Sequence, residues 1–117
     1  MDLNPVKLFF HPSLTDEIWF SKTIQYQILT IGAEFGRAKS LLKKGNFTEV
    51  KNSLERILEL LDVTKSDPKW LYRLKELTRF REWTAEFYFN QIDNPEICDH
   101  LYGFLLKWHP SVEGVEV

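Results

Sequence analysis

The helical spacing of apolar residues in the first half of the chain constrains its fold more than any other sequence feature. Between residues 24 and 42 apolar residues recur every three or four positions, which places them on one face of a helix. This stripe consists of Ile24, Ile28, Ile31, Phe35, Ala38 and Leu42. No proline occurs between Ser13 and Pro68, and Ser13 together with Asp16 resembles a capping box. We therefore predict one continuous helix over residues 13–44.

Three further helix starts are each marked by a residue whose side chain can cap the first turn. These signals are Asn46 after Gly45, Asp67 before Pro68, and Asn94 before Pro95. Asn and Asp side chains accept hydrogen bonds from the free N–H groups at a helix start, and proline fits the first turn. Apolar residues at helical spacing follow each signal. The signals therefore predict helices over residues 47–62, 68–91 and 95–108.

Four amphipathic helices with short connections predict an all-α fold, an antiparallel four-helix bundle. The 117 residues of the chain fit one domain, for which ~100–150 residues is usual. Residues 1–12 are expected to form a short N-terminal arm or a helical turn. Residues 110–117 are expected to form a flexible C-terminal tail.

The charge and cysteine content argue against several classes of partner. The formal net charge is −2 and acids alternate with bases, whereas nucleic-acid binding requires a basic excess or a basic stripe. No apolar run approaches the ~20 residues of a membrane span, and we expect no signal peptide. Cys98 is the single cysteine, so an internal disulfide is excluded. We expect a cytoplasmic protein that binds neither nucleic acid nor membranes.

The predicted turn at Gly45 resembles the middle of a tetratricopeptide repeat. The resemblance lies in residues 41–50, LLKKGNFTEV, continued by Leu54 and Ile57. It covers about one repeat of ~34 residues, and a solenoid needs about three repeats to bury its faces. One repeat length after Gly45 the chain has Arg79, inside a predicted helix. We interpret the segment as an ordinary helical hairpin.

No motif for catalysis or metal binding is present. The three histidines, His11, His100 and His109, are scattered, and no Glu-x-x-His pair exists, so the di-iron pattern of helical bundles is absent. The chain also lacks the glycine-flanked serine of hydrolases and a phosphate-binding glycine loop. The sequence therefore favours a non-enzymatic protein without a metal or another cofactor.

Arg81 is the main candidate for a ligand-binding residue. At about 100° per residue, it falls in the middle of the apolar side of the helix predicted over residues 68–91, between Trp70 and Tyr88. An unpaired guanidinium there would cost several kcal/mol, so it requires an acid from another helix, access to water or a bound anion. In the last case Arg81, Arg73 on the same flank and Gln25 would bind an anion or a carboxylate.

Two sets of residues are candidates for an interface. Tyr72, Arg79 and Trp83 project from the polar side of the same helix, and these residue types are enriched at interfaces; scattered surface aromatics are the simpler interpretation. Gly32 and Gly36 lie four residues apart inside the first helix. Small residues permit the close crossing of a neighbouring helix, and the same strip could admit a ligand or a second subunit.

Two functions remain open on these grounds. The first is a non-enzymatic helical protein–protein interaction module or assembly subunit, in the simplest case a homodimer. It rests on the aromatic content of 15%, which exceeds what a chain of this size should bury fully. The alternative is a small-molecule-binding or anion-binding bundle, with or without enzymatic activity, centred on Arg81.

Overall fold

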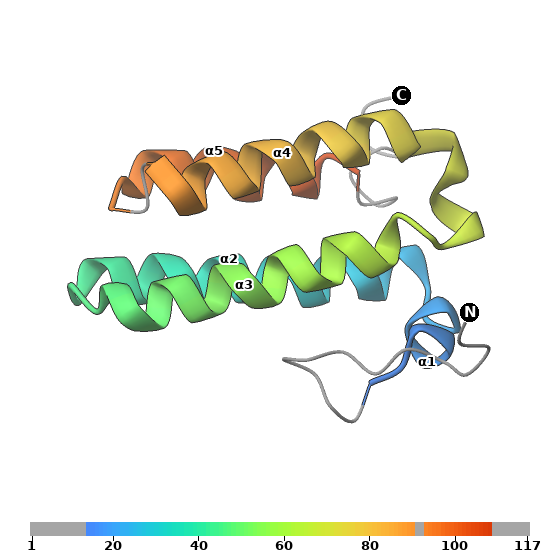
Figure 1. Ribbon diagram of the computed structural model, residues 1–117, viewed down its shortest axis with the longest axis horizontal. Helices are drawn as coiled ribbons and strands as arrows, with labels where there is room; N and C mark the ends of the chain where they lie inside the picture. Colours follow the sequence, from blue (N-terminus) through green and yellow to red (C-terminus); the bar gives the residue numbers. More distant parts are fainter. Residues whose placement is uncertain (1–13, 91–92, 109–117) are drawn as a thin grey trace.

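The computed structural model describes residues 14–90 and 93–108, which form an all-α bundle. Its elements are α1 (Asp16–Phe20), α2 (Ile24–Lys43), α3 (Phe47–Thr64), the 3-10 helix η1 (Pro68–Arg73), α4 (Leu74–Asn90) and α5 (Pro95–Leu106). α2 and α3 form one layer, α4 and α5 form the second, and consecutive long helices run antiparallel (Figure 1). The predicted four-helix bundle is confirmed. The arm expected over residues 1–12 and the tail expected over residues 110–117 lie outside the described residues.

The continuous helix predicted over residues 13–44 is wrong, because α1 and α2 are separated at residues 21–23. Thr23 has an extended backbone, and its Oγ1 accepts a hydrogen bond from the backbone N–H of Tyr26 at 3.1 Å. Ser21 donates its hydroxyl to the carbonyl of Ile18 at 2.6 Å. Hydroxyl side chains compete in this way with the helical hydrogen-bond ladder. Thr15 caps α1, since its Oγ1 accepts from Ile18 N at 3.2 Å.

The helix predicted over residues 68–91 is divided between η1 and α4. A 3-10 helix has about three residues per turn, so each residue advances by about 120°. A projection at about 100° per residue through η1 therefore assigns the wrong phase to the residues of α4. The buried residues of α4 are Leu77, Phe80, Thr84 and Phe87. The middle of this face was predicted at Arg81, between Trp70 and Tyr88, but both Arg81 and Tyr88 are only half-buried.

The capping signals of the other helices are confirmed. Asn46 accepts from Glu49 N at 3.3 Å, and Asp67 and Asn94 accept from the N–H groups two residues on, both at 3.0 Å. Gly45 ends α2 with a φ of +71°, which is unstrained for glycine. The N–H groups of Gly45 and Asn46 bond the carbonyls of Leu42 and Leu41, both at 3.0 Å. This Schellman turn explains the tight reversal between α2 and α3.

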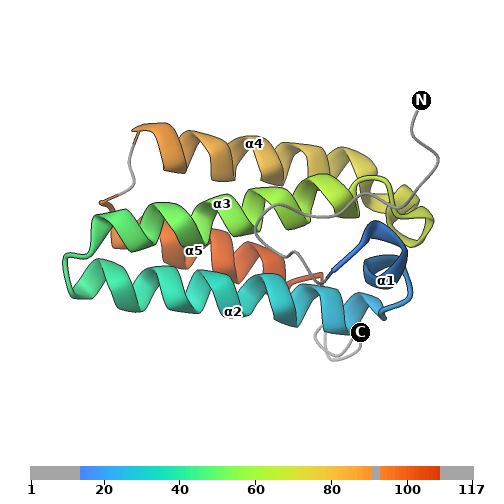
Figure 2. The ribbon, with the colours of Figure 1, turned by 60° about the horizontal axis from the view of Figure 1, so that its bottom comes forward.

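The apolar core lies between the two layers and is formed by all four long helices. Phe80 of α4 sits at its centre, with edge-to-face contacts to Phe35 at 5.9 Å and to Trp108 at 5.4 Å between ring centroids. α1 lies across the end of the bundle where α2 begins and α3 ends (Figure 2). α4 and α5 contact each other less extensively than α2 and α3 do. The α4–α5 pair is therefore where the bundle is least closed.

Candidate functional site

Arg81 does not occupy the middle of the apolar side of its helix. Its Nε and Nη2 donate to the two carboxylate oxygens of Asp62 on α3 at 2.9 and 3.0 Å. The Arg81 side chain is 32% exposed and that of Asp62 is 53% exposed. The expected position is wrong because η1 shifts the phase of α4. Since the guanidinium has an acid partner and reaches water, the sequence argument for a bound anion no longer applies.

The other two candidate ligand residues have different surroundings from Arg81. Gln25 is exposed near the start of α2. Arg73, at the end of η1, has its guanidinium 5.3 Å from the ring centroid of Tyr72 and 5.9 Å from that of Trp108. Arg73 thus stacks on aromatic rings at the junction of η1 with the end of α5, so the arrangement does not assemble the three residues into one anion clamp.

A buried polar cluster at the start of α2 was missed by the sequence analysis. Gln27 has 0% exposure. Its Nε2 donates to Asp67 Oδ2 at 2.8 Å and to the carbonyl of Trp19 at 2.9 Å, and its Oε1 accepts from Trp70 Nε1 at 2.7 Å. Gln27 therefore ties α1, α2 and η1 together with all of its amide hydrogen-bonding groups engaged.

Three further side chains complete this cluster, which we call the polar junction: Trp19, Gln27, Thr64, Asp67, Lys69 and Trp70. Lys69 Nζ donates to Asp67 Oδ2 at 2.8 Å and to the carbonyl of Phe20 at 2.6 Å. Trp19 Nε1 donates to Thr64 Oγ1 at 2.9 Å, and Thr64 donates to the carbonyl of Leu60 at 2.6 Å. Because its polar groups form hydrogen bonds with one another and with the backbone, the junction stabilises the packing of α1, α2, α3 and η1. Gln27 inside an apolar helix face was the signal that could have revealed it.

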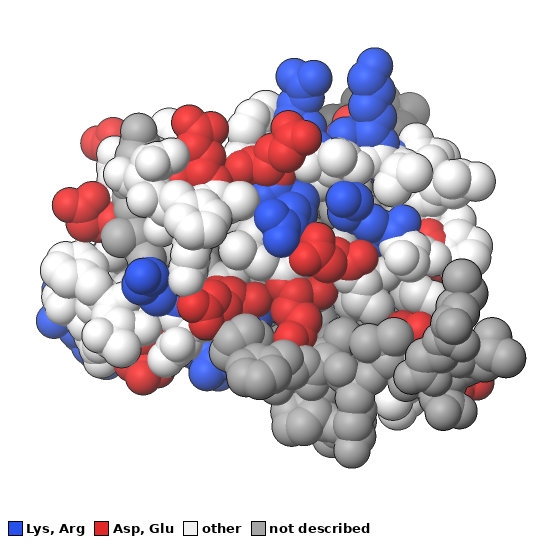
Figure 3. All heavy atoms as spheres, in the orientation of Figure 1, with Lys and Arg blue, Asp and Glu red and all other residues white. Residues whose placement is uncertain are grey.

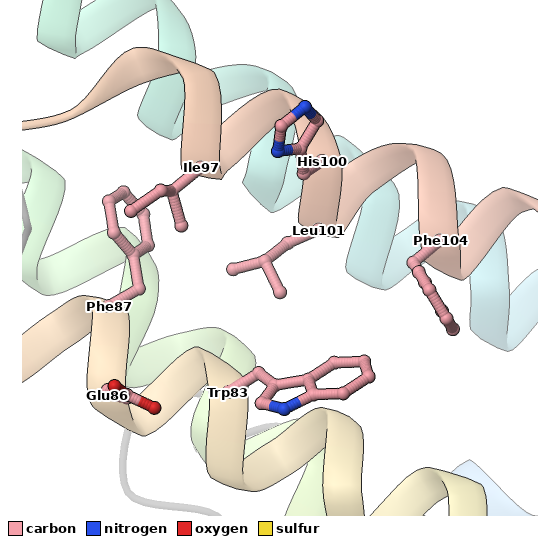
Figure 4. A pocket seen from close by; sticks show the side chains of 7 residues that line it. All are labelled: Trp83, Glu86, Phe87, Ile97, His100, Leu101 and Phe104. Carbon is pink, nitrogen blue, oxygen red and sulfur yellow. The ribbon is translucent and has the colours of Figure 1, made fainter.

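A groove between α4 and α5 is the clearest concave apolar feature (Figure 4). It has a volume of about 320 Å³ and is lined by Trp83, Glu86, Phe87, Ile97, His100, Leu101 and Phe104. Phe87 and Ile97 point toward each other across the gap, and Leu101 lies between the helices. Trp83 and Phe104 close one end with an edge-to-face contact of 5.2 Å between centroids.

A second hollow lies on the other side of the Trp83–Phe104 pair. It has a volume of about 330 Å³, and Lys75, Glu76, Arg79, Trp83 and Phe104 line it. A shallower hollow adjoins it over the outer side of α4 and includes Tyr72. We call the whole face the α4–α5 surface: Tyr72, Lys75, Arg79, Trp83, Glu86, Ile97 and Phe104.

The structure brings the three interface candidates of α4 and η1 onto this one surface. Tyr72 and Arg79 are exposed, and Trp83 is 38% exposed. Phe104 on α5, which forms the edge-to-face contact with Trp83, is 40% exposed. The sequence thus identified the residues that α4 contributes to the surface but not Phe104, which α5 contributes. The apolar spacing of α5 does not indicate which of its apolar side chains α4 leaves uncovered.

The glycine strip of α2 is where α5 crosses closely. A Cβ added at Gly32 would lie 3.7 Å from Cζ of Tyr102, and one at Gly36 would lie 4.0 Å from its Cε2. The helix-crossing interpretation of Gly32 and Gly36 is therefore supported. A second subunit is not needed to explain the strip, since Tyr102 of the same chain already lies against it.

Two other titratable side chains, Cys98 and Tyr88, each form a hydrogen bond within the bundle. Cys98 is buried and donates to the carbonyl of Phe35 at 3.6 Å; burial raises the pKa of its thiol to about 11, so the nucleophilic thiolate is scarce at neutral pH. Tyr88 donates to Glu55 at 2.6 Å, and this hydrogen bond raises the pKa of the phenol. Within residues 14–90 and 93–108, no three His, Cys, Asp or Glu side chains are arranged to hold a metal ion.

Among the described residues, no helix combines the length and the apolar composition that crossing a membrane requires. Comparisons with protein-family models, with curated proteins and with solved structures find no match for this chain.

Proposed function

We propose that this chain is a non-enzymatic helical interaction module that binds a protein partner through the α4–α5 surface. The observation that carries the proposal is the Trp83–Phe104 pair, whose two large rings stay partly in water in a bundle whose other tryptophans are buried. Burying such rings is favourable by roughly 25 cal/mol per Å² of apolar area. A partner that covers them gains this free energy.

The shape of the surface favours a helical partner. Two roughly parallel ridges, α4 and α5, leave apolar side chains between them, and an amphipathic helix places anchors at i, i+3 or i+4, and i+7 into such a groove. Phe87, Ile97 and Leu101 line the groove together with Glu86, and Arg79 lines the hollow on the other side of Trp83. An apolar centre with a charged rim is the usual composition of a protein interface.

A peptide titration tests the proposal. The probe is a synthetic amphipathic helix with leucines at i, i+3 and i+7, and a scrambled peptide of the same composition is its control. With ¹⁵N-labelled chain at low micromolar concentration, we expect the helical peptide to shift the Trp83 indole signal and amide signals of α4 and α5. The scrambled peptide should shift them far less.

A matched pair of variants places the binding site. Trp83→Gln should weaken peptide binding at least about tenfold, which corresponds to about 1.4 kcal/mol. Tyr26→Gln removes a more exposed aromatic ring from α2 and should leave binding unchanged. The proposal is wrong if both peptides give the same shifts, or if the two variants weaken binding equally.

A further inference from the structure

We infer that the partner is a second copy of this chain, related by a two-fold axis that passes the Trp83–Phe104 pair. This inference rests on the proposed function, because it names the partner of the same α4–α5 surface. Two-fold dimers are the commonest assemblies of identical chains, and each copy then presents the same self-complementary face. After a rotation of 180°, the apolar groups of one copy must therefore meet apolar groups of the other, and its acidic residues must meet basic ones.

The two hollows beside the Trp83–Phe104 pair are alike in size and differ in charge. The hollows on either side of the Trp83–Phe104 pair have volumes of about 320 and 330 Å³. Glu86 is the acidic residue of the first hollow, whereas Lys75 and Arg79 outnumber Glu76 in the second. Lys107 adds to the basic half, with its Nζ 5.1 Å from the ring centroid of Phe104.

Figure 3 shows the face on which α3 and α4 lie in front of α2 and α5, and acidic and basic side chains are interspersed over its middle. The opposition of charge is therefore a property of the two hollows and not of this face. A half turn about the Trp83–Phe104 pair would place the hollow that contains Glu86 in one copy over the hollow that contains Lys75 and Arg79 in the other.

The spacing of residues along α4 indicates which opposite charges would pair between the two copies: Arg79 and Glu86. Arg79 lies four residues before Trp83 and Glu86 lies three residues after it, so both are about one turn, or about 5 Å, from the axis. When two copies of α4 cross antiparallel at Trp83, Arg79 of each copy faces Glu86 of the other. Both charge pairs form together, around a centre made of two Trp83 and two Phe104 rings.

The size of the surface sets the expected strength. α4 has 17 residues and so is about 25 Å long, and two adjacent helices are about 20 Å wide. Such a face covers about 500 Å², which is less than the roughly 800 Å² per partner of a standard specific interface and is typical of weak, transient ones. We therefore expect a dimer that forms in the micromolar range and dissociates on dilution.

Sedimentation equilibrium of the full chain with charge-reversal variants tests the inference. Arg79→Glu and Glu86→Arg should each weaken the dimer at least about tenfold, because each places like charges opposite one another. An equimolar mixture of the two variants should form a heterodimer at least about tenfold tighter than either variant alone, since its two facing pairs are again opposite in sign. The double variant R79E/E86R should recover the affinity of the unaltered chain.

Lys43→Glu, which reverses an exposed charge at the end of α2, is the control and should leave the dimer unchanged. Circular dichroism of every variant should show the unaltered helical signal. A dimer that is insensitive to the reversals, or a mixture no tighter than its components, contradicts the two-fold arrangement.

The same experiment separates this inference from the proposed function. A chain that stays monomeric up to millimolar concentration, while its groove still binds the helical peptide, contradicts the dimer and leaves the interaction module standing. A chain that neither dimerises nor binds the peptide contradicts both.

Discussion

The polar junction and the α4–α5 surface both contain tryptophan, and they place it in opposite environments. Trp19 and Trp70 are 1% exposed, and each donates its indole N–H to a buried side chain, Thr64 or Gln27. Trp83 packs against Phe104 at the edge of a groove, and both rings stay partly exposed. The polar groups of the junction are hydrogen-bonded to one another and to the backbone, while the surface leaves apolar area in water.

This difference separates the part of the molecule that determines the fold from the part available for binding. A buried network whose members are all hydrogen-bonded stabilises one arrangement, and each member left without its partner costs a desolvation penalty. A partly exposed apolar surface adds little to the free energy of folding but retains free energy that a partner can gain. The effects of substitutions should therefore be large on stability at the junction and small on stability at the surface.

The largest expected effect is that of Gln27→Leu. The substitution leaves Trp70 Nε1 and the carbonyl of Trp19 without their partner, so we expect the free energy of unfolding to fall by about 2–5 kcal/mol. Urea unfolding followed by circular dichroism measures it. Gln25→Leu, two residues away and exposed, is the control and should change it by less than about 0.5 kcal/mol. Equal effects of the two changes would remove the distinction between the two regions.

Thr64→Val should have the next largest effect, about 1–3 kcal/mol, because a methyl group of similar size cannot accept from Trp19 Nε1. Adding Trp19→Phe removes the donor as well. The double variant should then lose less than the two single losses combined, because no polar group is left unpaired. A double-mutant cycle in urea gives this coupling, and purely additive losses would show that the hydrogen bond is unimportant.

Trp83→Gln should cost only about 1 kcal/mol in dilute solution, although it removes a larger side chain than Gln27→Leu does. Its ring is already partly in water and contacts Phe104 from one side, so less apolar area is lost from the interior. Thermal unfolding at low micromolar concentration measures the effect. A loss above about 3 kcal/mol, typical of a buried aromatic residue, would place Trp83 in the core rather than on a binding surface.

The smallest effect is expected for Arg81→Ala. Its ion pair with Asp62 is partly exposed, and exposed pairs contribute about 0–1 kcal/mol. Asp62→Ala should have a similarly small effect, and both should shrink further in high salt. A loss of several kcal/mol would instead fit the buried guanidinium that the sequence projection implied.

The helices and most of their caps could be predicted because their signals are local. Asn46, Asp67 and Asn94 each bond an N–H group two or three residues away, so neighbouring sequence contains the whole interaction. The break between α1 and α2 was missed because Ser21 and Thr23 are residue types that can either continue a helix or end and cap one. The hydrogen bond from Trp19 to Thr64, 45 residues away, accompanies the break, and no periodicity within residues 13–44 indicates that contact.

The candidate site was predicted in part for a related reason. Tyr72, Arg79 and Trp83 are all on the α4–α5 surface, as their projection away from the core implied. Arg81 was misplaced because the 3-10 turns of η1 rotate the face of α4, and a 3-10 turn after Pro68 is not distinguishable by sequence from the first turn of an α-helix. The role of Phe104 depends on how far α4 covers α5, which is a property of packing alone.

One measurement compares the two regions directly: the indole N–H signals of Trp19, Trp70 and Trp83 in ¹⁵N spectra recorded over a range of protein concentrations and after transfer to D₂O. In dilute samples, the Trp19 and Trp70 signals should persist for long after transfer and stay at fixed positions as concentration rises. The Trp83 signal should exchange at once when dilute, and it should shift and become protected as copies associate. A Trp83 signal that neither moves nor gains protection, or junction indoles that exchange as fast as Trp83, would contradict the account.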